Sequence, residues 1–258
     1  MRKLLLILVF LIGANICFAA RSCVLLCHFN GVDGATTYIS DDVNRRKATF
    51  VASAHLEQDQ KKFGTTSLAT ASATSDYITF PDSSDWAFGT ADFTIDFWVY
   101  FNTLQTDGTF MTFLDQYQDV NNRAGLYLYS PGGAGNPYQM IWRVVSASVT
   151  IIDRYSNNLT LSTGQWYHFA LTKSNGNYYF FLAGIQSGTV ADSVSVPNFS
   201  GSMYIGQRGD ASRYLNGYID EPRIVTGSAE WTANFTPLFG EYHYDGTPSS
   251  GDFFNFLR

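Results

Sequence analysis

The sequence predicts an all-β protein folded as a two-sheet antiparallel sandwich. Apolar and polar residues alternate along several short runs, and no long stretch shows the 3.6-residue period of an amphipathic helix. The strand-like runs recur about every 8–12 residues, as in sandwiches. Of the 258 residues, 45% are hydrophobic and 16% aromatic. This composition supplies a large core and is not that of a disordered chain.

The clearest strand covers residues 93–101. Its alternate positions form one apolar stripe, because successive side chains of a strand point to opposite faces. The stripe consists of Phe93, Ile95, Phe97, Val99 and Phe101. The opposite face carries Thr94, Asp96, Trp98 and Tyr100. A strand of this kind has one face in the core, and the surroundings of the other face bear on function.

Ten further runs are predicted to be strands. They cover residues 24–29, 77–80, 110–114, 126–129, 139–145, 150–155, 166–172, 178–182, 202–205 and 218–225. Gly, Asn and Asp in the gaps supply turn geometry. Between two of the strands, residues 174–177 read Ser-Asn-Gly-Asn, which is typical of a tight hairpin.

Residues 1–19 are predicted to be a secretory signal peptide. Arg2 and Lys3 precede the apolar run 4–12, and small residues lead to a cleavage position after Ala19. The alternative is an uncleaved membrane anchor, but the run is shorter than the ~20 residues that span a bilayer. We therefore expect a secreted, periplasmic or cell-surface protein with no membrane span after cleavage.

The remaining chain is predicted to form one domain, residues 20–240, followed by a C-terminal tail, residues 241–258. The tail holds a Gly, Ser and Pro linker at 245–251 and an apolar end at 253–257. Such an apolar end either docks on its own domain or contacts a protein partner or another copy of the chain.

Charge and cysteine content exclude some functions. The formal net charge is −6, and the one contiguous basic cluster is Arg45-Arg46-Lys47, so we expect no nucleic-acid partner. Cys23 and Cys27 remain after signal cleavage. On one strand they would share a face roughly 13 Å apart. That distance is too long for a disulfide, so we expect free thiols unless the N-terminal arm folds back.

Five segments in order resemble the laminin-G-like, concanavalin A-like jelly-roll family. The strongest is DYITFPDSSDWAFGTADFTIDFWVYF at 76–101. The others are VLLCHFNGVDG at 24–34, KFGTTS at 62–67, GQWYHFALTK at 164–173 and LNGYIDEPRIVTG at 215–227. The resemblance implies a jelly-roll sandwich. Because the family is functionally broad, it implies fold more strongly than function.

Catalytic residues are not expected. Glucanases with this sandwich place paired carboxylates on one strand, whereas Asp96 stands alone between Thr94 and Trp98. A second carboxylate could still be brought close to Asp96 by the fold, and Asp115 and Asp153 are the candidates for it. No serine-nucleophile, zinc-protease or phosphate-loop motif occurs in the sequence.

The resemblance also implies a calcium site near the first and last strands. Asn30, Asp33 and Asp220 would supply side-chain oxygens, the ligands that calcium prefers. The alternative is structural: Asp33 caps a turn, and Asp220 pairs with Arg223 or Arg208.

The candidate ligand-binding residues are Asp96, Trp98, Tyr129 and Trp142, on strands that would share a non-core face. Aromatic faces with a few polar groups are typical of sugar sites. The alternative is that most of these rings belong to the core. We therefore expect an exported, non-catalytic module that recognises glycans or a cell-surface polymer. A structural, adhesion or phage-virion appendage component is the second interpretation, and a glycoside hydrolase is the third.

Overall fold

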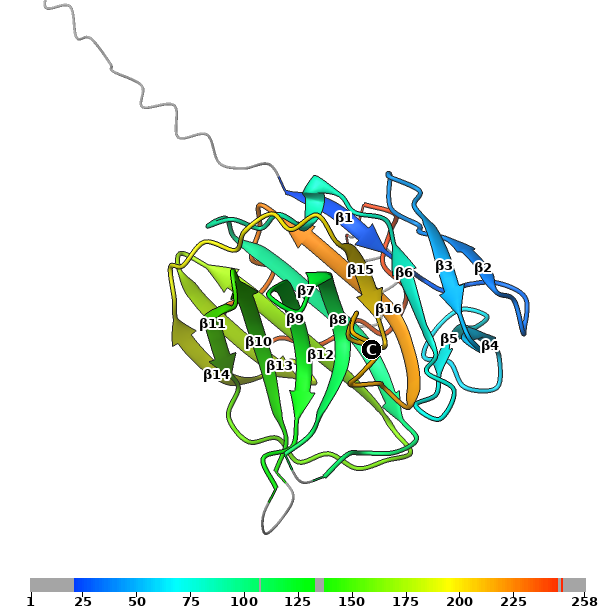
Figure 1. Cartoon of the computed structure of the whole chain (residues 1–258). Coiled ribbons are helices and arrows are strands. Elements are labelled where there is room, and N and C mark those ends of the chain that lie inside the picture. The colour runs from blue at the N-terminus through cyan, green and yellow to red at the C-terminus, as the bar shows by residue number, and fades with distance from the viewer. Residues whose placement is uncertain (1–20, 107, 133–136, 246, 248–258) are drawn as a thin grey trace, which may run out of the picture.

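The protein is a sandwich of two sheets, each with eight strands (Figure 1). A computed structural model describes residues 21–106, 108–132, 137–245 and 247. All strand pairings between the described strands are antiparallel. The predicted fold class is therefore confirmed. The predicted signal peptide, 1–19, and the apolar end of the tail lie outside the described residues.

The first sheet contains the predicted central strand, β7 (Phe93–Phe101), between β12 and β16. Its order is β14 (Ile185–Ala191), β13 (Asn177–Leu182), β12 (Trp166–Ser174), β7, β16 (Gly217–Thr226), β5 (Ser67–Thr70) and β4 (His55–Glu57). A further strand, β1 (Ser22–Leu26), pairs with the other end of β16.

The second sheet packs against the first and has β8 and β9 near its middle (Figure 1). Its order is β11 (Val149–Tyr155), β10 (Gln139–Ser146), β9 (Asn122–Tyr129), β8 (Phe110–Asp119), β15 (Ser202–Ile205), β6 (Tyr77–Phe80), β3 (Lys47–Val51) and β2 (Thr37–Ile39). The helical turn η1 (Ser84–Trp86) lies between β6 and β7.

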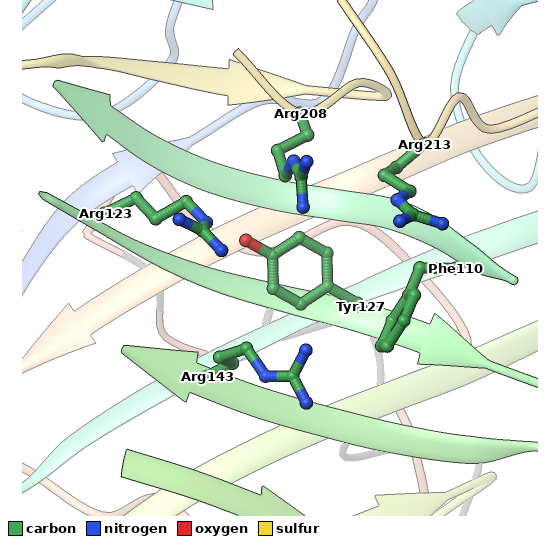
Figure 2. Close-up of a pocket in the computed structure, with 6 residues that line it drawn as sticks. All are labelled: Phe110, Arg123, Tyr127, Arg143, Arg208 and Arg213. Atoms are coloured by element: carbon green, nitrogen blue, oxygen red, sulfur yellow. The ribbon is translucent and has the colours of Figure 1, made fainter. Parts of the chain in front are cut away.

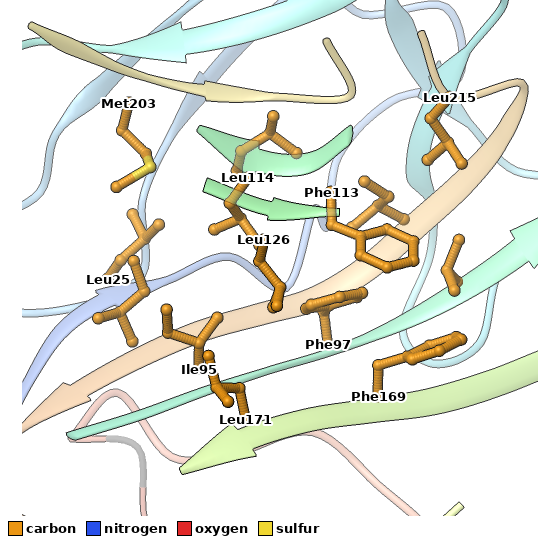
Figure 3. Close-up of a cluster of buried hydrophobic side chains, with 14 of the residues drawn as sticks. Leu25, Ile95, Phe97, Phe113, Leu114, Leu126, Phe169, Leu171, Met203 and Leu215 are labelled. Atoms are coloured by element: carbon orange, nitrogen blue, oxygen red, sulfur yellow. The ribbon is translucent and has the colours of Figure 1, made fainter. Parts of the chain in front are cut away.

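The core lies between the two sheets and is built on the predicted stripe of β7. All five stripe residues are at most 2% exposed. Phe97 stacks on Phe169 of β12 at 5.9 Å and meets Phe113 of β8 at 4.7 Å (Figure 3). The two sheets therefore interdigitate through aromatic rings, which bury large apolar areas.

The predicted hairpin is confirmed. Ser174 pairs with Asn177, and the two turn residues Asn175 and Gly176 have φ of 49° and 73°. Left-handed conformations at both positions match the right-handed twist of the flanking strands.

Five strands were not predicted: β2, β3, β4, β5 and β14. Four of them have three to five residues, too few to show a period. The fifth, β14, reads IQSGTVA and has no buried residue, because it is the edge strand of the first sheet. These strands form through pairing with neighbours rather than through their own pattern.

Cys23 and Cys27 are free and buried, as expected. The expectation that they share a face is wrong, because the pairing of β1 with β16 shifts register between Cys23 and Leu25. Cys27 lies in the main core, whereas Cys23 packs with Leu26 and Tyr242 on the other side. Tyr242 is 5% exposed, so the first residues of the predicted tail pack on the domain. The boundary at residue 240 stays a prediction.

Candidate functional site

The outer face of the first sheet is covered in part by the segment 228–242, which follows β16. Trp231 and Phe235 stack on each other at 3.8 Å, and both rings meet the edge of His168 on β12. The backbone of the segment is bound as well: Thr94 accepts from the Glu230 N–H, and Thr172 donates to the Trp231 carbonyl. The face that the sequence left open is therefore partly occupied by the chain itself.

Asp96 lies at the centre of a buried polar network under this segment. Its carboxylate accepts from Arg223 Nε at 2.8 Å, from the Tyr242 hydroxyl at 2.7 Å and lies 3.2 Å from His168 Nε2. Burial alone would raise the pKa of Asp96, but Arg223, His168 and Tyr242 together lower it. The carboxylate is ionised and fully enclosed.

The expectation that Asp96 faces a ligand is therefore wrong for this structure, since its exposure is 0%. Asp115 and Asp153 do not complete a catalytic pair with it either. They lie on β8 and β11 of the second sheet, with the core between them and Asp96. Two carboxyl groups must flank one bond for glycoside hydrolysis.

The three aromatic candidates lie in three different places. Trp142 is 2% exposed and packs against Phe88 and Phe93 in the core, so its predicted position on the non-core face is wrong. Trp98 is half-buried on the outer face of the first sheet, with Lys62 Nζ 4.0 Å above its ring. Tyr129 is half-buried at the end of β9 in the second sheet.

The calcium candidates are occupied by backbone donors. Asp220 is buried, and its two oxygens accept from the N–H groups of Lys62, Phe63 and Glu221.

Asn30 accepts from the Thr65 N–H, and Asp33 from the Gln58 N–H. Within the described part of the chain no group of three His, Cys, Asp or Glu side chains is placed to hold a metal. Calcium binding stays an untested prediction. The alternative pairing of Asp220 with Arg223 is not seen, because Arg223 binds Asp96.

The strongest candidate site is a small hollow on the outer face of the second sheet. We call it the arginine cup. It is lined by Phe110, Arg123, Tyr127, Arg143, Arg208 and Arg213. Figure 2 shows the guanidinium groups arranged around the Tyr127 ring. Four arginines in one hollow are unusual for a chain with net charge −6.

Strand register brings the first part of the cup together. Arg123 and Tyr127 occupy alternate positions of β9, so both point to the outer face. Arg143 on β10 pairs with Gly125 of β9, and Phe110 on β8 pairs with Tyr129. The side chains of three adjacent strands therefore converge.

The loop between β15 and β16 supplies the other two arginines. The Thr112 N–H of β8 donates to the Arg213 carbonyl at 2.9 Å, and the Gly206 N–H donates to the Phe113 carbonyl at 3.2 Å. Arg213 itself has φ of 63°, a left-handed conformation that the surrounding hydrogen bonds hold. Because these bonds hold both ends of the loop on β8, they fix the positions of Arg208 and Arg213.

Tyr127 and Asp115 form the floor of the cup. The Tyr127 hydroxyl donates to Asp115 at 2.6 Å, and the Gly209 N–H donates to the other oxygen at 3.3 Å. A Cβ on Gly125 would lie 2.1 Å from the Tyr127 hydroxyl and 2.5 Å from the Asp115 oxygen. Glycine at this position is what leaves room for the pair.

The ligand-binding candidates predicted from the sequence, Asp96, Trp98, Tyr129 and Trp142, include none of the six residues that line the cup. Arg123 lies in the same alternating pattern as Tyr127, so a longer strand prediction would have found it. Arg208 and Arg213 lie in a loop, and nothing in the sequence places that loop over β8.

The sequence profile of the concanavalin A-like lectin/glucanases superfamily matches residues 72–232. The chain belongs to this superfamily. The expected resemblance is thus confirmed over the region that holds β7, the cup and most of both sheets.

Solved structures agree on the fold of this superfamily member. Domain 4 of AbnA, a GH43 extracellular arabinanase from Geobacillus stearothermophilus, is 17% identical with a TM-score of 0.59, covering 81% of this chain and 94% of that one. The binding domain of Paraclostridial Mosquitocidal Protein 1 is 16% identical with the same TM-score, covering 81% and 49%. A botulinum neurotoxin type C structure is 12% identical with a TM-score of 0.56, covering 81% and 48%.

The chain spans about half the length of the two toxin structures. At these identities the likeness shows the fold. No curated protein sequence matches the chain significantly. Within the residues described, no helix is long and apolar enough to cross a membrane.

We expect Asp115, in the floor of the cup, to make the stability of this concanavalin A-like domain depend on pH. Burial raises the pKa of Asp115 to about 7 from its ordinary value of 3.8, although Tyr127, Gly209, Arg123 and Arg208 act in the opposite direction. The Asp115 carboxyl therefore holds its proton more tightly in the folded state than in the unfolded chain. The stability contributed by protonated Asp115 is complete below pH 3.8 and is lost as the pH rises through about 7.

We expect Asp115→Asn to remove this dependence. Urea unfolding of both proteins between pH 4 and 8 would measure it, and the unfolding free energy of the wild type should fall relative to the variant across that interval. Parallel curves would show that Asp115 is not held protonated.

Proposed function

We propose that this domain is a non-catalytic recognition module that binds a glycan or another surface polymer through the arginine cup and the rings beside it. One observation carries the proposal: aromatic rings and guanidinium groups lie side by side in a hollow on the outer face of the second sheet. Aromatic rings can hold the apolar face of a ligand, and polar groups beside them can orient it.

The rings form a row along one side of the cup. Phe110 stacks on Tyr129 at 4.6 Å, and Tyr129 meets the edge of Tyr155 at 6.5 Å. Arg143 donates to Asp153 at 2.8 and 3.0 Å and to the Tyr155 hydroxyl at 2.9 Å, which fixes its fork beside the row. A sugar presents an apolar ring face and hydroxyl oxygens, so this row and Arg143 complement both.

Two solved structures with this fold support the proposal that this chain binds a glycan. The arabinanase domain was solved in complex with arabinotriose, and cell entry of botulinum neurotoxin type C depends on interaction with two ganglioside molecules. These ligands belong to those proteins, and the arabinotriose complex of a domain with this fold supports a glycan ligand for this chain.

The non-catalytic part of the proposal rests on the carboxylates. Asp96 is enclosed, Asp115 is buried below Tyr127, and Asp153 is bound by Arg143. All three carboxylates are therefore already held by side chains of the domain itself. Incubation with β-glucans, galactans and other polysaccharides should release no new reducing ends.

Export to the periplasm, the cell surface or the medium is part of the same proposal and fits the predicted signal peptide. A structural or adhesion role in an appendage or virion is the alternative. It depends on the C-terminal apolar residues, which lie outside the described chain.

A pair of variants tests the location of binding. Tyr129→Ala removes a ring of the row, and we expect polysaccharide retention to fall roughly ten-fold, from a loss of about 1–2 kcal/mol of ring contact. Trp98→Ala removes a half-buried ring on the opposite sheet and should leave retention unchanged. Affinity electrophoresis measures both, with melting temperature as the folding control. Loss in Trp98→Ala instead of Tyr129→Ala would move the site to the first sheet.

A further inference from the structure

The arginine cup carries more positive charge than its carboxylates balance. Arg143 is paired with Asp153, and Arg208 with Asp210. Within the described residues, no ion pair involves Arg123 or Arg213. The paired arginines are oriented by their partners, and the other two are available to a ligand.

Arg213 is held in place without a carboxylate. Its guanidinium carbon lies 5.1 Å from the centre of the Phe110 ring, and that of Arg143 lies 5.2 Å from the same ring. Burial and the nearby positive charge of Arg208 lower the pKa of Arg213. Arginine nevertheless stays ionised, so the local potential is positive.

Arg123 has an unused donor at the other side of Tyr127. One of its terminal nitrogens donates to the Val120 carbonyl, whereas its buried Nε has no hydrogen-bond partner among the described residues. A buried donor without an acceptor is costly, and an anionic oxygen would remove that cost.

Asp115 offsets this charge only in part. It lies under Tyr127 and is hydrogen-bonded to it, and its pKa is raised to about 7 by burial. At neutral pH the carboxyl is therefore protonated in a large fraction of molecules.

We infer that the cup binds an anionic group of a glycan, a carboxylate or sulfate carried on a sugar ring, with Arg213 and Arg123 as the charge-bearing contacts. This rests on the proposed glycan-binding function and narrows its ligand class. The guanidinium fork matches carboxylate and sulfate oxygens, and Phe110 and Tyr129 would pack against the ring that carries them. A neutral sugar would leave the positive charge of the cup unbalanced.

Matched oligosaccharides test the ligand class. We would compare oligogalacturonate with its methyl ester, sialyllactose with lactose, and a sulfated galactan fragment with its desulfated form, by calorimetry at low and at 0.5 M salt. At least one charged member should bind roughly ten- to a hundred-fold more tightly than its neutral partner. That preference should weaken at high salt, because the cup is open to screening.

Two arginine variants with equal charge change provide the control. Arg213→Gln should remove the preference for the charged member. Arg45→Gln should retain it, since Arg45 is 62% exposed in a loop at the other end of the sheet and shares the left-handed backbone conformation of Arg213. Arg213→Lys keeps the charge without the fork and should give an intermediate preference. If Arg213→Gln fails to fold, the proposal is tested by the other two results. Arg213→Lys should still give an intermediate preference for the charged member, and high salt should still weaken that preference.

The outcomes separate the two proposals. Equal binding of charged and neutral members, unchanged by Arg213→Gln, would overturn the anionic class and leave glycan recognition standing. Binding of inorganic sulfate or phosphate as tightly as the charged sugars would overturn the sugar part of the inference. Binding of no oligosaccharide, charged or neutral, would overturn the proposed function itself.

Discussion

Replacing Asp96 with alanine is expected to lower the free energy of unfolding by about 3–5 kcal/mol. Asp96 and Arg223 are at most 1% exposed and are joined at 2.8 Å. Removing one member of a buried ion pair leaves the other without its main compensation. Because the pKa of Asp96 is lowered, its stabilising contribution is present above the unfolded value of 3.8 and is lost as the pH falls through the folded value.

Urea unfolding at neutral pH measures the loss, with Asp82→Ala as the matched control. Asp82 is exposed in the loop after β6, and its substitution should change stability by less than about 0.5 kcal/mol. In a double-mutant cycle with Arg223→Ala, the two losses should add to more than the loss in the double variant. A decrease below 1 kcal/mol for Asp96→Ala would mean that the network contributes little.

Replacing Phe97 with alanine is expected to cost about 3–5 kcal/mol, because a large cavity would open between the sheets. Phe97 is fully buried and contacts Phe113 of the second sheet as well as Phe169 of the first. The lost contacts therefore come from both layers, and the sheets could close the cavity only by moving toward each other, which the close-packed side chains around it oppose.

The control for this variant is Phe239→Ala. Phe239 is 74% exposed, so its loss should leave the unfolding midpoint almost unchanged. Chemical denaturation of both variants gives the comparison. A Phe97→Ala protein as stable as the wild type would contradict the placement of the β7 stripe at the centre of the sandwich.

Local sequence pattern was enough to predict the architecture. The alternation in residues 93–101 predicted one buried face, and Phe93 to Phe101 lie in the core at every second position. The Asn175-Gly176 pair predicted a tight turn, and both residues adopt the left-handed backbone conformations that such a turn requires. Both features depend on residues only a few positions apart. They are therefore visible in the sequence as period-2 alternation and as typical turn residues.

The predicted binding face failed for a different reason. A strand pattern separates two faces but does not say what covers either of them. Asp96 points away from the core as predicted, yet segment 228–242, more than 130 residues further along the chain, closes over it. For Trp142 the assignment of the face itself was wrong. The alternation of Trp142 with Arg143 did not reveal which of the two side chains faces the core.

The sequence by itself determined the sandwich, its central strand and its family. Only the tertiary structure decided where a ligand can bind. The sequence shows one contiguous basic cluster, Arg45-Arg46-Lys47, while the fold gathers Arg123, Arg143, Arg208 and Arg213 from two strands and a loop into one hollow. Charges far apart along the chain interact only once strand register and loop anchoring bring them within a few ångströms, where Coulomb energies become large. That distance dependence is why the net charge of −6 gave no indication of a positive site.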